Sequence, residues 1–172
     1  VLVAAGECTK EDGLHGDAAL RRSVLFGLAA RLASIDVAEH PGRVRSGPLD
    51  IETLLHDLAD ETLGSLDAQG FIGAQTIQGQ DGFYATRRTR AAAGSDFDSI
   101  MRVRVMCFAC RAALARMGEE VNESVPVNAN GTIRADVADG LDASVTSYMT
   151  RELGRRVSSV SVQVDRTADL VS

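Results

Sequence analysis

The chain has 172 residues, of which 45% are hydrophobic and 24% charged, a balance typical of a globular protein and a length that fits one domain, or one domain plus an appended segment. Its formal net charge of −6 argues against a general nucleic-acid binder, because such proteins are normally basic. No apolar run approaches the roughly 18 residues of a membrane-spanning helix. Three cysteines, an odd number, do not suggest a disulfide framework. The start at Val1 lacks the features of a signal peptide, and we interpret the chain as an internal fragment or a processed product.

The first third of the chain predicts two helices joined by irregular segments. Residues 1–5 are short and apolar, which fits a buried strand, whereas the polar, glycine-rich residues 6–16 predict a loop. Residues 17–34 begin with an aspartate that can cap a helix and carry apolar residues at helical spacing. Residues 35–38 predict a brief strand. A second helix is predicted for residues 51–66.

A β-hairpin follows at residues 71–88. Two extended segments, residues 71–78 and 83–88, flank the sequence Gly-Gln-Asp-Gly at 79–82. Asp-Gly between apolar runs is the strongest short hairpin signal, because both residues adopt the positive φ angles of a tight turn.

The longest predicted element is a central helix at residues 96–117, preceded by a Ser95-Asp96 cap. Projected at 100° per residue, its apolar residues form two stripes separated by arginines. A surface helix has one apolar stripe, so two stripes predict burial on both sides. The first stripe is Phe97, Met101, Val105, Phe108 and Ala112, and the second is Ile100, Val103, Met106, Cys107, Cys110 and Leu114.

The last third predicts a helix and a strand. Residues 134–153 carry an apolar helical face, with Gly154 in the position of a C-cap. In residues 157–165, valines alternate with polar residues, which predicts a strand with one buried face. Since strands and helices do not alternate strictly, the predicted class is α+β. We expect a small, mainly antiparallel sheet, formed by the hairpin 71–88 and the strand 157–165, packed against several helices.

The pair Cys107 and Cys110 has the spacing of thiol oxidoreductases. That chemistry needs the first cysteine near a helix N-terminus, where the dipole stabilises a thiolate, whereas Cys107 lies about ten residues inside the central helix. Both sulfurs share one apolar stripe, so we predict buried, inert thiols. A zinc site would need two further ligands. Cys8, in the predicted loop, is the better candidate for a reactive or intermolecular thiol.

Other candidate sites have simpler explanations. His56-Asp57 is similar to the His-Asp pair of metal-dependent phosphohydrolases, but neighbouring helix residues point about 100° apart, and we interpret the pair as exposed helix polarity. Arg87, Arg88 and Arg90 form the densest positive cluster, which favours a solvated edge or a protein-contacting patch. The sequence has no nucleophile elbow and no phosphate-binding loop. We therefore predict no catalytic, cofactor-binding or metal-binding residue.

Six stretches carry a family resemblance that covers about residues 41–169. They are GRVRSGPL (42–49), the Gly70-Phe71 strand start, GQDGFYATRRTR (79–90), SDFDSIMRVRVMCFACR (95–111), VNANGTI (127–133) and VSVQVDRT (160–167). In this order and spacing they resemble the conserved-core, C-terminal half of tail sheath proteins from contractile-tailed bacteriophages.

The resemblance implies a structural subunit rather than an enzyme. Sheath proteins form rings of six that stack helically around a tail tube and contract to drive the tube through the host envelope, without cofactor or metal. By this reading, residues 41–172 are the sheath-like core, residues 1–40 are an N-terminal strand, loop and helix of the same domain, and the interlocking terminal arms of relatives are absent. The implied location is the virion tail, assembled in the host bacterial cytoplasm.

The implied partners are neighbouring sheath subunits, the tail tube protein, the baseplate and the tail terminator, without nucleic acid or membrane insertion. The candidate subunit or tube contacts are Arg87, Arg88, Arg90, Arg155, Arg156 and Cys8, the last through an intermolecular disulfide. Two other hypotheses stay open: another tail component, such as a tube, terminator or baseplate adaptor, and a small thiol oxidoreductase built on Cys107 and Cys110.

Overall fold

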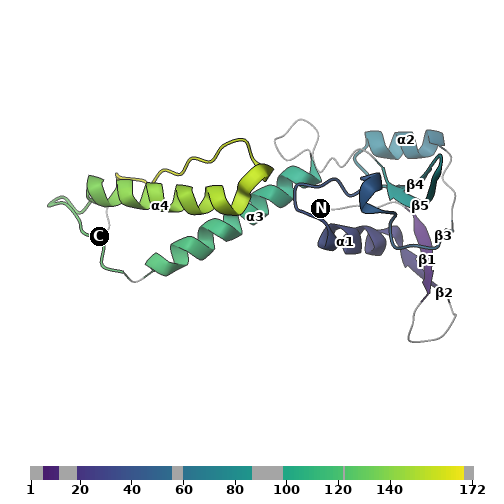
Figure 1. Ribbon diagram of the computed structural model, residues 1–172, viewed down its shortest axis with the longest axis horizontal. Coiled ribbons are helices and arrows are strands. Elements are labelled where there is room, and N and C mark those ends of the chain that lie inside the picture. Colours follow the sequence, from purple (N-terminus) through teal and green to yellow (C-terminus); the bar gives the residue numbers. More distant parts are fainter. Residues whose placement is uncertain (1–5, 12–18, 56–59, 87–98, 122, 169–172) are drawn as a thin grey trace. The chain divides into compact units, whose positions relative to one another are not determined.

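The computed structural model describes residues 6–11, 19–55, 60–86, 99–121 and 123–168 (Figure 1). The chain divides into two compact units, Val1–Arg104 and Val105–Ser172, and each is described by itself. Helices and two small antiparallel sheets make up the regular structure of the described residues. This confirms the predicted α+β class.

The first unit begins with a three-stranded antiparallel sheet in the order β2-β1-β3. Its strands are β1 (Glu7–Glu11), β2 (Ala19–Ser23) and β3 (Thr53–Leu54). The prediction of a loop at residues 6–16 was therefore wrong for β1. The prediction of a helix from residue 51 was also wrong, because the amides of Glu52 and Leu55 donate to β1 carbonyls, each at 3.0 Å. Residues 1–5 and 12–18 lie outside the described part of the chain.

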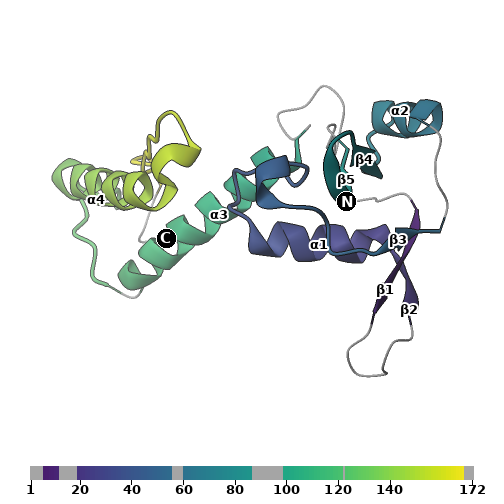
Figure 2. The same cartoon turned by 45° about the vertical axis from the view of Figure 1, so that its right-hand side comes forward.

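Helix α1 (Val24–Ser34) starts later than its apolar periodicity predicts. The hydroxyl of Ser23 accepts a hydrogen bond from the amide of Leu25 at 3.2 Å and caps the helix, while the preceding residues pair as β2, which passes directly into α1 (Figure 2). Residues 35–38 form a turn and not the predicted strand. The helix buries Val24 and Leu28 in the main core, whose other buried members are Cys8, Leu49, Ile72, Ala74 and Ala85.

The predicted hairpin is confirmed as β4 (Ala74–Ile77) and β5 (Gln80–Ala85), with Gly79 at a φ of +76° between them. The register shifts between Gln75 and Ile77, so that β5 starts inside the predicted turn. Helix α2 (Asp60–Ala68) precedes the hairpin and is shorter than predicted.

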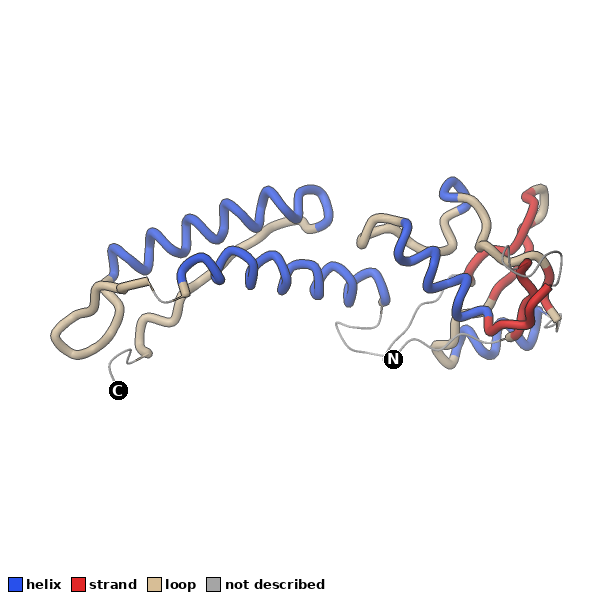
Figure 3. Tube along the Cα trace, turned by 90° about the horizontal axis from the view of Figure 1, so that it is seen from below, coloured by secondary structure: helices blue, strands red, loops and turns tan. Residues whose placement is uncertain are grey.

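The second unit contains most of α3 (Ile100–Met117) and all of α4 (Ala135–Leu153), which confirms the predicted helix 134–153. Gly154, at a φ of +50°, ends α4 as expected of a C-cap. The buried core of this unit is Ala112 from α3 and Val145, Met149 and Leu153 from α4. Figure 3 shows the two helices and the extended segment that follows α4.

Residues 157–165 are extended but do not form the predicted strand. Val160 and Val162 pack against the core cluster, as their alternation predicts, yet no sheet partner is found for this segment among the described residues. Side chains of α4 hold the segment instead: Asp142 accepts from the amide of Val164 at 2.6 Å, and Arg166 pairs with Asp142 at 3.2 Å and with Asp139.

Candidate interaction surface

The face of α3 that turns away from the core is apolar and exposed. Val105, Phe108 and Ala112 pack into the cluster shared with α4, as the first predicted stripe requires. The second stripe was predicted to be buried as well, and this was wrong: Leu114 is 72% exposed and Met106 is 49% exposed. The described residues provide packing partners for one side of the helix. We call the exposed side the α3 outer stripe, and its members are Met106, Cys107, Cys110, Leu114 and Met117.

The prediction that Cys107 and Cys110 are buried was wrong, since both are exposed free thiols within the α3 outer stripe. They lie well inside the helix, and the free amides of a helix N-terminus, which would stabilise a thiolate, are out of reach. The geometry therefore provides two accessible thiols that lie away from a helix N-terminus.

Cys8 lies inside the first unit instead of on a loop. It is 1% exposed, its backbone pairs with β2 through Arg22 and with β3 through Leu54, and burial raises its pKa, an effect that the charge of Arg22 partly opposes. An intermolecular disulfide through Cys8 would require this strand to open.

We expect thiol labelling to separate these cysteines. Ellman's reagent should react within minutes with two thiols of the native protein, Cys107 and Cys110, because both are exposed, and with Cys8 only after denaturation. The double variant Cys107→Ser/Cys110→Ser should show no fast thiol. Three fast thiols in native protein would contradict the buried position of Cys8.

The arginines predicted as contacts have different environments. Arg155 is exposed in the short 3-10 turn that follows α4, Gly154–Arg156. The guanidinium of Arg156 lies 5.1 Å from the ring centre of Phe108 and donates to the carbonyl of Glu152 at 2.9 Å, so it stabilises the second unit. Arg87, Arg88 and Arg90 lie outside the described residues, as do His56 and Asp57.

The glycines of the resemblance motifs bring distant segments together in the first unit. A Cβ added to Gly42 would lie 2.3 Å from the carbonyl oxygen of Ala85, and one added to Gly82 would lie 2.6 Å from the Cβ of Pro48. The amide of Leu49 also donates to the carbonyl of Phe83 at 2.7 Å. The segments GRVRSGPL and GQDGFYA are therefore packed against each other, backbone to backbone. Sequence reasoning identified these segments but not their contact.

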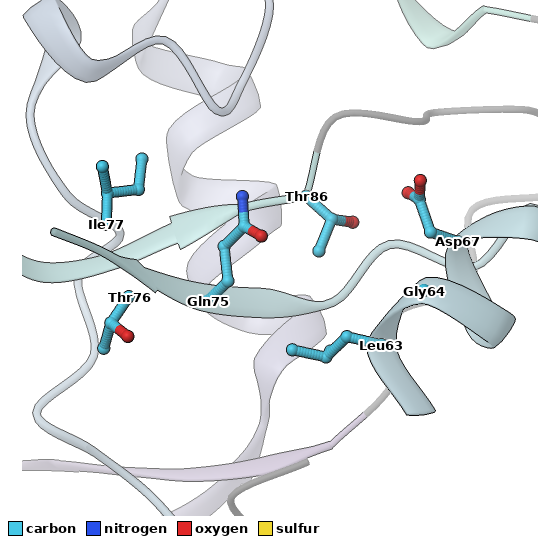
Figure 4. Close-up of a pocket in the computed structure, with 7 residues that line it drawn as sticks. All are labelled: Leu63, Gly64, Asp67, Gln75, Thr76, Ile77 and Thr86. Atoms are coloured by element: carbon cyan, nitrogen blue, oxygen red, sulfur yellow. The ribbon is translucent and has the colours of Figure 1, made fainter. Parts of the chain in front are cut away.

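A groove of about 480 Å³ lies between α2 and β4, and sequence reasoning missed it (Figure 4). Its walls combine an apolar side chain, Leu63, with polar ones such as Gln75 and Asp67. The hydroxyl of Thr86 at its edge already accepts a hydrogen bond from the amide of Gly73 at 3.1 Å. Among the described residues that line it, the groove offers hydrogen-bonding groups and one titratable side chain, Asp67.

Helix α1 also carries exposed apolar residues. Phe26 is 61% exposed, and the guanidinium of Arg22 lies 5.9 Å from its ring centre. Ala29, Ala30 and Ala33 are exposed at helical spacing on the same side. An exposed phenylalanine beside an arginine is a composition enriched in the cores of protein–protein interfaces.

The described residues show neither a metal-binding cluster nor a membrane-spanning helix. No three His, Cys, Asp or Glu side chains among them gather so as to hold a metal ion. No helix in the same described part combines the length and the apolar character needed to cross a membrane.

Residues 13–89 match a protein-family model described as DUF2586, N-terminal domain. The match lies within the first unit, where it includes two of the resemblance motifs and most of a third. No curated protein and no solved structure matches the chain. The family description states no activity, so the resemblance to tail sheath proteins remains a prediction.

Proposed function

We propose that this protein is a structural subunit of a contractile phage tail sheath. In this proposal the subunits polymerise as stacked hexameric rings around the tail tube and contract to drive the tube through the host envelope. The observation that carries the proposal is the α3 outer stripe, because contiguous exposed apolar residues on a folded unit mark a surface that another protein covers.

The motif residues support a structural role as well. Gly42 and Gly82 permit close contact between two backbone segments, which is a packing role and not a chemical one. A sheath subunit has to remain folded while its contacts with neighbours change, since contraction releases energy stored in the extended lattice. A tightly packed first unit with apolar faces on helices fits that requirement.

Electron microscopy of the full-length protein tests the proposal. We expect rings or tubes of uniform diameter, and the same particles after treatment with a chelator, because sheath assembly uses no metal. A protein that stays monomeric at all concentrations would contradict the proposal. Thin tubes without stacked rings, or single rings that do not stack, would favour a tube, terminator or baseplate component instead.

The exposure of Cys107 and Cys110 is the observation that favours the second candidate, a small thiol oxidoreductase. Their position inside α3 opposes it, because the attacking thiol of such enzymes lies near a helix N-terminus, where the helix dipole stabilises a thiolate. The rate of insulin reduction in the presence of a dithiol would decide between the candidates. An enzyme should exceed the uncatalysed rate and lose the excess in the variant Cys107→Ser, whereas a structural subunit should match the uncatalysed rate.

A further inference from the structure

The second unit has two exposed helix faces that point away from each other. Both α3 and α4 turn their buried residues toward the shared cluster of Ala112, Val145, Met149 and Leu153. The α3 outer stripe therefore lies on one side of this helix pair. On the other side is a face of α4 that we call the α4 outer face, and its exposed members are Asp136, Asp139, Gly140, Ala143 and Ser147.

The two faces are complementary in size. The α3 outer stripe carries the long side chains of Met106, Leu114 and Met117. On the α4 outer face the central residues are small, and a Cβ added to Gly140 would meet no atom within 4 Å. Long side chains on one helix pack well against a row of small residues on another, because the backbones can then approach closely.

The two faces are also complementary in charge. Residues 100–117 of α3 include no acidic residue. Of its arginines, Arg104 binds carbonyls at the end of α1 and Arg116 pairs with Glu119 and Glu120, whereas Arg111 is exposed beside the stripe. The first half of α4 exposes Asp136 and Asp139. These aspartates pair with Arg134 and Arg166 of their own chain, but all four side chains are at least 43% exposed, so the pairs are weak and the carboxylates can accept further donors.

We infer that the α3 outer stripe of one copy docks on the α4 outer face of a second copy. Because the two faces lie on opposite sides of one unit, each copy can bind one neighbour through α3 and another through α4. Such a head-to-tail contact propagates into a closed ring or an open helix, whereas a self-complementary contact stops at a dimer. The inference rests on the proposed function and names the surfaces through which neighbouring subunits would meet.

Two variants of the full-length protein test the contact by blocking one side each. Leu114→Arg places a charge in the α3 outer stripe, and Ala143→Arg places a long charged side chain on the α4 outer face. In sedimentation velocity across a concentration series, wild type should form species larger than a dimer. Each variant alone should associate more than about tenfold more weakly, which corresponds to about 1.4 kcal/mol, because docking would bury the new charge without a partner.

The mixture of the two variants gives the sharpest result. An Ala143→Arg copy keeps its α3 outer stripe and a Leu114→Arg copy keeps its α4 outer face, so an equimolar mixture should form a dimer and stop there. Ser161→Arg, at an exposed position on the extended segment, is the matched control and should associate as wild type does. Circular dichroism should show all three variants folded, since each site is exposed.

Other outcomes overturn the inference in recognisable ways. If Ala143→Arg associates normally while Leu114→Arg does not, the α3 outer stripe does not bind the α4 outer face. It then binds either a second α3 outer stripe or a different partner. If the mixture forms no dimer, or wild type remains monomeric, the contact does not exist. Rings or tubes formed by wild type and by both variants would refute this contact and leave the proposed function standing. A mixture that dimerises while wild type forms open filaments, without rings or tubes, would refute the proposed function alone.

Discussion

Gly42→Ala should destabilise the first unit by about 3 kcal/mol, near the upper end of what overpacking costs. The added methyl group would lie 2.3 Å from the carbonyl oxygen of Ala85 and 3.2 Å from its carbonyl carbon. Both neighbours are backbone atoms at the end of β5, and Ala85 is 2% exposed, so they cannot move aside as a flexible side chain would. Relief of the clash requires the segment before Leu49 to separate from the hairpin.

Urea unfolding followed by circular dichroism measures this loss, and hydrogen exchange assigns it to the first unit. The amides of Leu49 and Thr86 should exchange faster in Gly42→Ala, because their acceptors are the carbonyls of Phe83 and Gly73 in the packed region. Gly64→Ala is the matched control: Gly64 lies inside α2, and a Cβ there meets no atom within 4 Å. That variant should be more stable by roughly 0.5–1 kcal/mol, because alanine favours helix over glycine. Equal stability of Gly42→Ala and wild type would contradict the close approach.

Elements with local signals were predictable from the sequence. The hairpin formed in the predicted region, although its turn lies at residues 78–79 and Asp81-Gly82 belongs to β5, and α4 ended at Gly154 as its C-cap position indicates. The sheet β2-β1-β3 was not predictable in this way, because its pairing is nonlocal. Thr9 and Thr53 lie 44 residues apart in sequence, yet their hydroxyl oxygens are 2.6 Å apart. The local sequence of β1 favours a loop and that of β3 favours a helix. Both segments are strands because they pair with each other.

The candidate site shows a different limit of sequence reasoning. Helical projection identified the apolar residues of α3 correctly, but apolar character alone does not say whether the partner lies in the same chain. Phe108 packs against the core cluster that α3 shares with α4, whereas Leu114 on the other side is exposed. A second apolar stripe on a helix can therefore indicate an intermolecular contact as well as a central position in a core.

The contacts that arginine side chains make within the chain were not predictable from the sequence, for a related reason. In a sequence, an arginine within an amphipathic helix is typical of a solvated face. In the structure, Arg104 donates to the carbonyl of Leu32 in the last turn of α1 and to those of Ile35 and Asp36, the latter two at 3.2 Å each. Burial lowers its pKa. Carbonyls at a helix C-terminus have no partner within the helix, so a basic side chain that reaches them stabilises the end of α1.

Arg31 holds the segment around Gly47. Replacement of Arg31 should therefore cause the second large loss of stability. Its guanidinium donates to the carbonyls of Ser46, Gly47 and Pro48, with the Gly47 contact at 2.8 Å. Three carbonyls that converge on one planar cation fix the segment in a way that one point charge cannot reproduce. This segment leads into Leu49, a buried member of the main core, so its order and the packing of the core are coupled.

We expect Arg31→Met, which keeps the length of the stem, to lower the free energy of unfolding by about 2–3 kcal/mol, the range for hydrogen bonds to a charged donor. Arg31→Lys should recover part of the loss, since an ammonium can reach one or two of the three carbonyls. Arg45→Met is the matched control, because Arg45 is exposed in the same segment, and it should change stability by less than about 0.5 kcal/mol. Urea unfolding provides the energies, and faster hydrogen exchange at the amides of Ser46 and Gly47 would assign the effect to this segment. Equal losses in Arg31→Met and Arg45→Met would mean that charge, and not the three-carbonyl contact, stabilises the segment.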